Sequence, residues 1–219
     1  MKIGIIGAGN IGGTLTRRLA ALGHDVVVAN SRGPDTLKAL ADESGARAVT
    51  VEEAAHGRDV VIVTIPEKSI PALPKNLFAD RRDTVVVDTG NYYPRRDGKL
   101  GAIEEGTTES RWVSQQLGHP VIKAFNNIYA KHLMENGRPR GDAKRIALPV
   151  AGDDARTKSV VMRLVDELGF DPVDAGTLDE SWRQQPGSPV YGTDHDAEGV
   201  KRALAAASPE RPAGFRAGS

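Results

Sequence analysis

Three glycines near the start of the chain, Gly7, Gly9 and Gly12, have the spacing G-x-G-x-x-G. They follow an apolar run at residues 2–6 and precede a segment whose apolar residues recur at helical spacing. In such a strand–turn–helix the first glycine permits a tight turn, the second lets a phosphate approach, and the third allows close helix–strand packing. The pattern predicts a dinucleotide site, against the alternative of a tight turn without a ligand. We expect its contacts from Gly7, Ala8, Gly9, Asn10, Ile11 and Gly12.

The end of the next apolar run, at residues 25–29, is followed by Asn30, Ser31 and Arg32. In dinucleotide-binding folds a carboxylate at this place accepts hydrogen bonds from the adenosine ribose and repels a 2′-phosphate. This chain instead offers an amide, a hydroxyl and a guanidinium, whose planar fork suits phosphate oxygens. We therefore expect NADP(H) as the cofactor. The alternative is that Arg32 is an ordinary surface arginine.

Three further apolar runs, at residues 59–65, 84–88 and 121–125, predict buried strands of a parallel sheet because they lack polar alternation. Ligands of such sheets cross the carboxyl ends of the strands. The nicotinamide half of the cofactor is therefore expected to contact the residues that follow or end these runs. They are Thr64, Ile65, Pro66, Asn91, Ala124 and Asn126.

No side chain is assigned a catalytic role. Lys123 and Asn127 have the spacing of the Lys/Asn pair of β-hydroxyacid dehydrogenases, but that pair lies on a helix, whereas residues 121–125 predict a strand. Hydride transfer between two stacked rings depends on positioning and exclusion of water more than on a protein acid or base. No metal site is expected either, because the chain has no cysteine and its five histidines are scattered.

The elements that must position these residues alternate between strand and helix along the chain. Thr50 and Glu53 resemble a capping box before a helix, and residues 147–174 predict one more βαβ unit. The sequence thus predicts an α/β, Rossmann-type fold, doubly wound around a mostly parallel sheet, with a C-terminal lid segment. We interpret residues 1–177 as the NADP-binding Rossmann domain and residues 178–219 as the lid segment followed by a flexible tail.

Composition limits the partners of the protein. The 219-residue chain has 29 basic and 29 acidic residues, so no net charge favours nucleic acid or an anionic membrane surface. No apolar stretch approaches the length of a membrane span, and the apolar start is too short for a signal peptide. We expect a cytoplasmic protein that acts on a small-molecule redox acceptor, with no nucleic-acid or membrane partner, and we consider a homodimer as its assembly.

The chain resembles the NADPH-dependent coenzyme F-420 reductase (deazaflavin:NADP oxidoreductase) family over most of its length. The matching segments are residues 7–12, 31–32, 63–66, 124–126, 149–154, 160–162 and 174–176. Residues 121–126 are also similar to the NADPH-binding domain of six-transmembrane metalloreductases, which pass hydride to a flavin. The resemblance implies NADP(H) at the glycine turn and a tricyclic acceptor, coenzyme F-420 or a flavin, stacked on the nicotinamide. Residues 178–187 depart from the more apolar segment of the deazaflavin reductases, so the acceptor pocket is expected to differ.

Together these observations predict an NADPH-dependent oxidoreductase that transfers hydride between NADP(H) and a deazaflavin or flavin. Two alternatives stay open. One is a reductase of a small carbonyl or imine substrate. The other is an NADP(H)-binding redox sensor without turnover, which a chain lacking a catalytic set equally permits.

Overall fold

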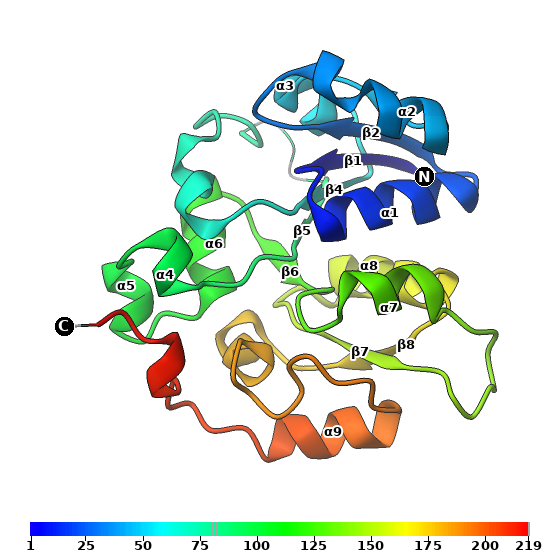
Figure 1. Ribbon diagram of the computed structural model, residues 1–219. Coiled ribbons are helices and arrows are strands. Elements are labelled where there is room, and N and C mark those ends of the chain that lie inside the picture. The colour runs from blue at the N-terminus through cyan, green and yellow to red at the C-terminus, as the bar shows by residue number, and fades with distance from the viewer. Residues whose placement is uncertain (80, 82, 219) are drawn as a thin grey trace.

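Six parallel strands form one sheet, in the order β3-β2-β1-β4-β5-β6, and helices cover both of its faces (Figure 1). This arrangement is that of a computed structural model, which describes residues 1–79, 81 and 83–218. The strands are β1 (Lys2–Ile6), β2 (Asp25–Ala29), β3 (Arg47–Ala48), β4 (Val60–Val63), β5 (Val85–Asp88), β6 (Val121–Lys123), β7 (Ala147–Val150) and β8 (Asp171–Asp174). The α-helices are α1 (Asn10–Ala21), α2 (Lys38–Ser44), α3 (Val51–Ala55), α4 (Pro94–Asp97), α5 (Gly101–Glu104), α6 (Glu109–Leu117), α7 (Ala130–Glu135), α8 (Ala155–Glu167) and α9 (Ala197–Ala205). Short 3-10 helices are η1 (Pro34–Leu37), η2 (Glu67–Ala72), η3 (Leu178–Gln184) and η4 (Ala213–Phe215).

The predicted Rossmann-type, doubly wound fold is confirmed. The strand order reverses direction between β1 and β4, and in such sheets ligands bind in the crevice at that point, outside the carboxyl ends of the strands. The capping box is also present, because Thr50 Oγ1 accepts the N–H of Glu53 and Glu53 Oε2 accepts the N–H of Thr50. Strand boundaries are shorter than predicted: the apolar run at residues 59–65 yields only Val60–Val63 as β4.

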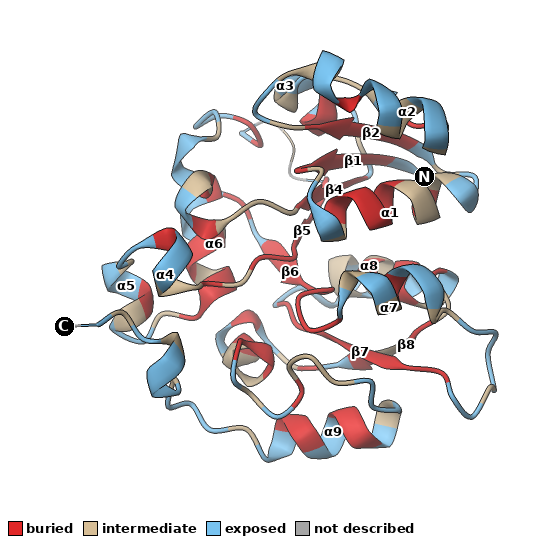
Figure 2. Cartoon of the chain, viewed as in Figure 1, coloured by how far each residue is buried: buried red, intermediate tan, exposed pale blue. Residues whose placement is uncertain are grey.

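The strands are buried on both sides because alternate residues supply two different layers of the core. Val60 and Ile62 of β4 pack in one apolar cluster with residues of α1 and α8. Val61 and Val63 pack in a second cluster with residues of α3 and α6. Figure 2 shows the central strands as buried. Runs of valine and isoleucine without polar alternation are what a sheet covered on both faces requires.

The last predicted βαβ unit forms a small sheet of its own and does not extend the large one. β7 and β8 pair in parallel with each other, and α8 connects them. The two sheets meet at an antiparallel bridge, in which the N–H of Lys123 donates to the carbonyl oxygen of Ala151 at 2.8 Å and the reverse bond is 3.0 Å long. Because the chain passes β6 in the opposite direction at this bridge, the parallel ladder ends there.

The end of the chain, for which the sequence predicts a flexible tail, contacts distant residues in the structure. Arg211 reaches the carboxylate of Glu109 at 2.9 Å, and the ring of Phe215 lies 6.3 Å from the ring of Tyr93. Residues 208–218 have no apolar period, so their local composition resembles that of a flexible tail. Their placement depends on partners far away in the sequence, which local composition cannot reveal.

Candidate functional site

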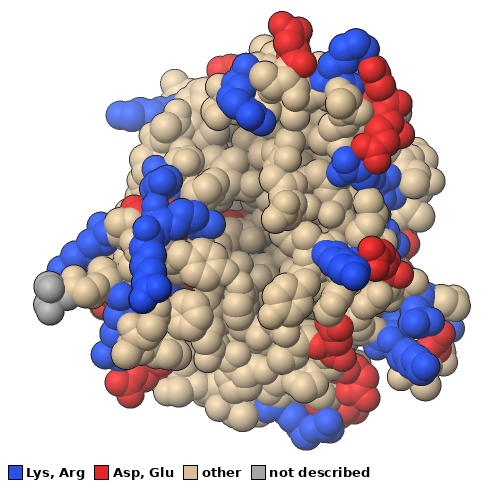
Figure 3. Space-filling view, viewed as in Figure 1, with Lys and Arg blue, Asp and Glu red and all other residues tan. Residues whose placement is uncertain are grey.

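A groove of about 910 Å³ runs along the carboxyl ends of β1, β2 and β4. The face drawn in Figure 3 is hollowed near its middle, close to where the central strands of Figure 1 end. Most residues predicted for the cofactor line the groove: Gly7, Ala8, Gly9, Asn30, Ser31, Arg32, Thr64, Ile65 and Pro66. Another wall of the groove, which the sequence did not predict, consists of residues in and beside α3 and η2: Thr50, Val51, Glu52, Lys68, Ser69, Ala72, Leu73 and Pro74. No motif marks these residues, since only the packing of two separate helices brings them to the groove.

The glycine turn fits a pyrophosphate. Gly7 has a φ of +112°, which side chains rarely allow, and a Cβ on Gly12 would overlap the carbonyl oxygen of Gly7, so the fold itself requires both glycines. A Cβ on Gly9, in contrast, meets no atom within 4 Å. Gly9 precedes α1, whose first turn has no side-chain cap. Free backbone N–H groups and open space therefore lie together, as a phosphate needs. Asn10 is exposed beside them, whereas Ile11 packs against the core.

Two cationic side chains, Arg32 and Lys68, line the groove, and the described residues provide no ion-pair partner for either. Asn30 shapes this part of the groove: its Oδ1 accepts the N–H of Arg32 and its Nδ2 donates to Thr36 Oγ1, both at 2.9 Å. The amide of Asn30 therefore holds the turn, and Ser31 and Arg32 are left for a ligand. Two unpaired cations and a hydroxyl suit a 2′-phosphate.

The polar residues that follow β5 and β6 bond to one another. Asn91 Nδ2 donates to the carbonyl oxygen of Asn126 at 2.9 Å, and Asn126 Nδ2 donates to Asn91 Oδ1 at 3.0 Å. Gln184 of η3 donates from Nε2 to Asn126 Oδ1 at 2.9 Å, which ties the C-terminal segment to the same place. Ala124, in contrast, is completely buried in the core, so its predicted contact with the nicotinamide is corrected.

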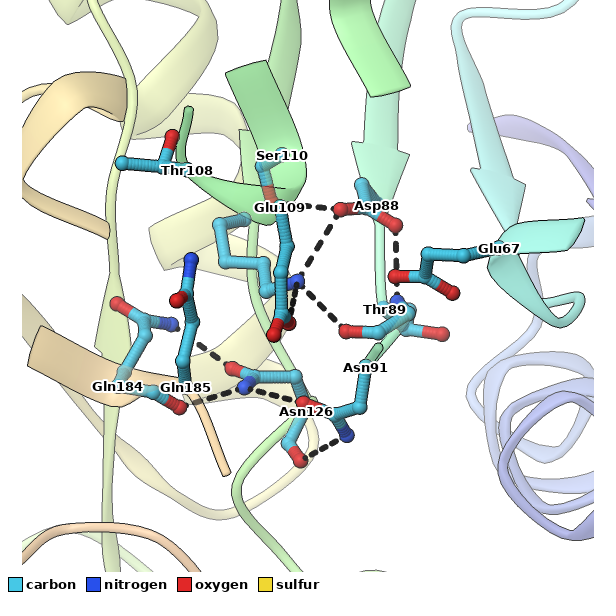
Figure 4. Close-up of polar contacts among 12 residues, drawn as sticks. Glu67, Asp88, Thr89, Asn91, Thr108, Glu109, Ser110, Asn126, Gln184 and Gln185 are labelled. Carbon is cyan, nitrogen blue, oxygen red and sulfur yellow. Dashed lines mark hydrogen bonds and ion pairs between the residues drawn. The ribbon is translucent and has the colours of Figure 1, made fainter. Parts of the chain in front are cut away.

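A cluster of ionisable side chains lies buried at the carboxyl ends of β5 and β6 (Figure 4). Lys123 Nζ donates to Asp88 Oδ2 at 3.2 Å and to the carbonyl oxygen of Gly90 at 2.6 Å, and it lies 4.0 Å from Glu109. Glu67 borders the cluster, since a Cβ on Gly90 would come within 2.5 Å of its carboxylate. The three acids and the lysine are each at most 1% exposed. The sequence pointed to Lys123 but not to the acids, because nothing local distinguishes a buried glutamate from a surface one.

Burial and charge act in opposite directions on these groups. Burial raises the pKa of Glu67 well above its ordinary value, and the neighbouring Asp88 raises it further. Burial also raises the pKa of Glu109, against the opposing effects of Lys123 and Arg211. Burial would lower the pKa of Lys123, but the nearby carboxylates outweigh it and the pKa lies above its ordinary value. The cluster therefore favours a charged Lys123 and a neutral Glu67.

Lys123 thus lies on a strand, as its sequence predicts, and its ammonium group is enclosed by protein atoms. Its bonds hold the turn after β5 in place. Within residues 1–79, 81 and 83–218, no group of three or more His, Cys, Asp or Glu side chains is arranged to hold a metal ion. Over the same residues, no helix combines the length and apolar character needed to cross a membrane.

Replacing Glu67 with Gln is expected to flatten the pH dependence of stability. The folded protein keeps a proton on Glu67 that the unfolded chain loses above its ordinary pKa of 4.5. Wild-type stability should therefore fall as the pH rises from that value towards the folded pKa, by up to about 1.4 kcal/mol per pH unit. Urea unfolding between pH 5 and pH 8 measures the slope. The control is Glu135→Gln, at an exposed glutamate, which should keep the pH slope of the wild type. Parallel curves for wild type and Glu67→Gln would show that Glu67 does not hold this proton.

Comparison with known proteins agrees with the groove. The sequence profile of the family described as "NADP oxidoreductase coenzyme F420-dependent" matches residues 2–92, which include the glycine turn and β4. A hypothetical protein of Sinorhizobium meliloti is 33% identical in sequence, with a TM-score of 0.78 over 89% of this chain and 95% of that chain.

Two other relatives are similar to most of the chain. Metalloreductase STEAP3 of Rattus norvegicus is 29% identical over 178 residues, which are 81% of this chain and 34% of the relative. A crystal structure from Arthrobacter sp. FB24, described as an F420-dependent NADP-reductase, shares the fold at 24% identity, with a TM-score of 0.67 over 83% of this chain and 87% of that one. The chain spans less than two thirds of the length of the curated relatives that it matches. The fold, the groove and these relatives agree: residues 2–92 match the family of coenzyme F420-dependent NADP oxidoreductases, and the chain as a whole shares its fold with the Sinorhizobium and Arthrobacter structures.

Proposed function

We propose that the protein transfers hydride between NADP(H) and a planar ring acceptor of the deazaflavin or flavin class. When bound, NADP(H) supplies or receives the hydride at its nicotinamide ring. The backbone of the glycine turn holds the pyrophosphate, and Arg32 and Lys68 hold the 2′-phosphate. Residues 64–66 support the nicotinamide half at the end of β4.

The enclosed position of Lys123 is the observation that favours a ring acceptor. Reduction of a carbonyl or imine adds a proton to the heteroatom, and a positioned acid typically contributes about 10²–10⁴-fold to such a step. Lys123 has the sequence spacing for this role, but its ammonium group is bonded to Asp88 and Gly90. A conjugated ring accepts hydride without that acid, since its electrons spread over the ring system.

The names of two relatives are compatible with this class of acceptor. The Arthrobacter structure is described as an F420-dependent NADP-reductase, and the rat relative is a metalloreductase. Their names differ in the final acceptor, so the acceptor of this chain has to be tested directly. The proposed reaction needs no nucleic-acid or membrane partner.

Gly9→Val is expected to abolish NADPH binding while the protein stays folded. The new Cβ would meet no protein atom within 4 Å, and the side chain would fill space beside the free N–H groups of α1. Gly12→Val is the matched control in the same turn. It overlaps the Gly7 carbonyl, so it should lower the free energy of unfolding by about 1–3 kcal/mol or more. Calorimetric titration and urea unfolding separate the two effects. Unchanged NADPH affinity in a folded Gly9→Val protein would exclude the turn as the pyrophosphate site.

Arg32→Ala is expected to weaken NADPH binding by roughly 10- to 150-fold, because a charge-assisted bond to the 2′-phosphate is lost. Lys68→Ala should act in the same direction by about 2- to 5-fold, as an exposed ion pair would. NADH lacks the phosphate, so its affinity should barely change in either variant. Arg202→Ala, an exposed arginine of α9 outside the groove, is the control. The ratio of the NADPH and NADH dissociation constants, measured at one ionic strength, tests whether these side chains bind the 2′-phosphate. Equal weakening of both nucleotides would remove Arg32 from the site.

Loss of NADPH absorbance under anaerobic conditions tests the acceptor. We expect oxidation with coenzyme F-420, FMN or riboflavin and none with small ketones or cyclic imines. Turnover with a ketone or an imine alone would contradict the ring acceptor. Tight NADPH binding without oxidation by any compound would indicate a sensor and would overturn the proposed reaction.

A further inference from the structure

Tyrosines gather at the carboxyl edge of the sheet from three parts of the chain. Tyr93 follows β5, Tyr129 follows β6, and Tyr191 comes from the C-terminal segment. The hydroxyls of Tyr93 and Tyr191 contact each other. Gly192 donates its N–H to the carbonyl oxygen of Asn127 at 2.8 Å, and a Cβ on Gly192 would lie 3.1 Å from the hydroxyl of Tyr129. The C-terminal segment is therefore fastened to the ends of both β5 and β6, where ligands of such sheets bind.

The hydroxyl pair leaves one proton without an acceptor. Each phenol carries a single proton, and the contact between Tyr93 and Tyr191 uses one of the two. The described residues offer no acceptor to the other. Burial, followed by the hydroxyl of Tyr191, raises the pKa of Tyr93, so Tyr93 stays protonated near neutral pH. The pair thus presents a neutral hydrogen-bond donor at the carboxyl edge.

Tyr93 is the fixed member of the pair. The guanidinium carbon of Arg96 lies 5.0 Å from the centre of its ring, and Phe215 of the C-terminal tail packs beside it. No cation–π or ring contact of this kind is found for Tyr191 among the described residues. Tyr129 next to it is 59% exposed. Tyr93 therefore positions Tyr191, and the exposed ring of Tyr129 extends the aromatic surface.

We propose that Tyr191, positioned by Tyr93, donates a hydrogen bond to a ring carbonyl oxygen of the hydride acceptor. This inference rests on the proposed function and names the residue that recognises the acceptor. Hydride leaves C4 of the nicotinamide with its electron pair and bonds to the acceptor ring; the nicotinamide is oxidised and the acceptor is reduced. The added negative charge spreads to the conjugated carbonyl oxygen, where a donor stabilises it, until water supplies a proton. Tyr191 and Tyr93 keep their own protons throughout.

Tyr191→Phe removes this donor and keeps the ring. With coenzyme F-420 or FMN we expect kcat/KM to fall by about 3- to 10-fold, with an unchanged NADPH dissociation constant. With phenazine methosulfate, a tricyclic acceptor without a ring carbonyl oxygen, the enzyme-dependent rate of the same variant should equal that of the wild type once the uncatalysed oxidation of NADPH is subtracted. A merely structural tie between the two tyrosines would slow both acceptors alike.

Tyr92→Phe is the matched control. The hydroxyl of Tyr92 donates to the carbonyl oxygen of Gly98 at 2.9 Å, inside the fold, so this variant should lower the melting temperature without changing acceptor selectivity. Tyr191→Phe that reacts with F-420 or FMN as wild type does would overturn the role of Tyr191 and leave the proposed function standing. If the wild type oxidises NADPH with none of the ring acceptors, the proposed function fails, and the inference fails with it.

Discussion

The buried ammonium group of Lys123 is the constraint on which the carboxyl edge of the sheet depends. The backbone of Lys123 joins the large sheet to the small one through Ala151. The ammonium group of Lys123 donates to Asp88 at the end of β5 and to the carbonyl oxygen of Gly90 in the turn beyond. A charge taken out of water is costly unless paired and hydrogen-bonded, so removing either partner leaves the other charge uncompensated. One residue, Lys123, therefore fixes the positions of the ends of β5 and β6 and of the second sheet relative to one another.

The same bonds explain why Lys123 has a structural role and no catalytic one. An ammonium group has three donors, and two of those of Lys123 are engaged by Asp88 and the Gly90 carbonyl, with Glu109 nearby. Arg211 also pairs with Glu109, so an arginine near the end of the chain belongs to the same cluster of buried charges. Residues 64–66, which line the groove at the end of β4, carry no charge, which suits a reaction that depends on placing two rings face to face.

Sequence predicted those parts of the molecule whose signal is local. The glycine turn, the apolar strands and the Asn30-Ser31-Arg32 run each carry their information in a few adjacent residues, and the structure places them at one groove. Lys68 and the acids around Lys123 were missed because their role arises only when separate elements pack. Ala124 shows the opposite error: it lies near the end of an apolar run at the correct edge, but its side chain faces the core. The contacts of the chain end could not be predicted either, because Arg211 and Phe215 find their partners far away in the sequence.

The two halves of the site are held together by different kinds of contact. The family profile ends at residue 92, so it covers the glycine turn, the end of β2 and β4, where backbone geometry and two cations shape the nucleotide groove. The other half joins the turns after β5 and β6 to the C-terminal segment by bonds between side chains, such as those of Asn126 with Asn91 and Gln184. Backbone geometry constrains sequence tightly, whereas side-chain contacts can be exchanged while the fold is kept. The groove at the glycine turn therefore lies within the part of the chain that matches the family profile, whereas the C-terminal segment lies outside it.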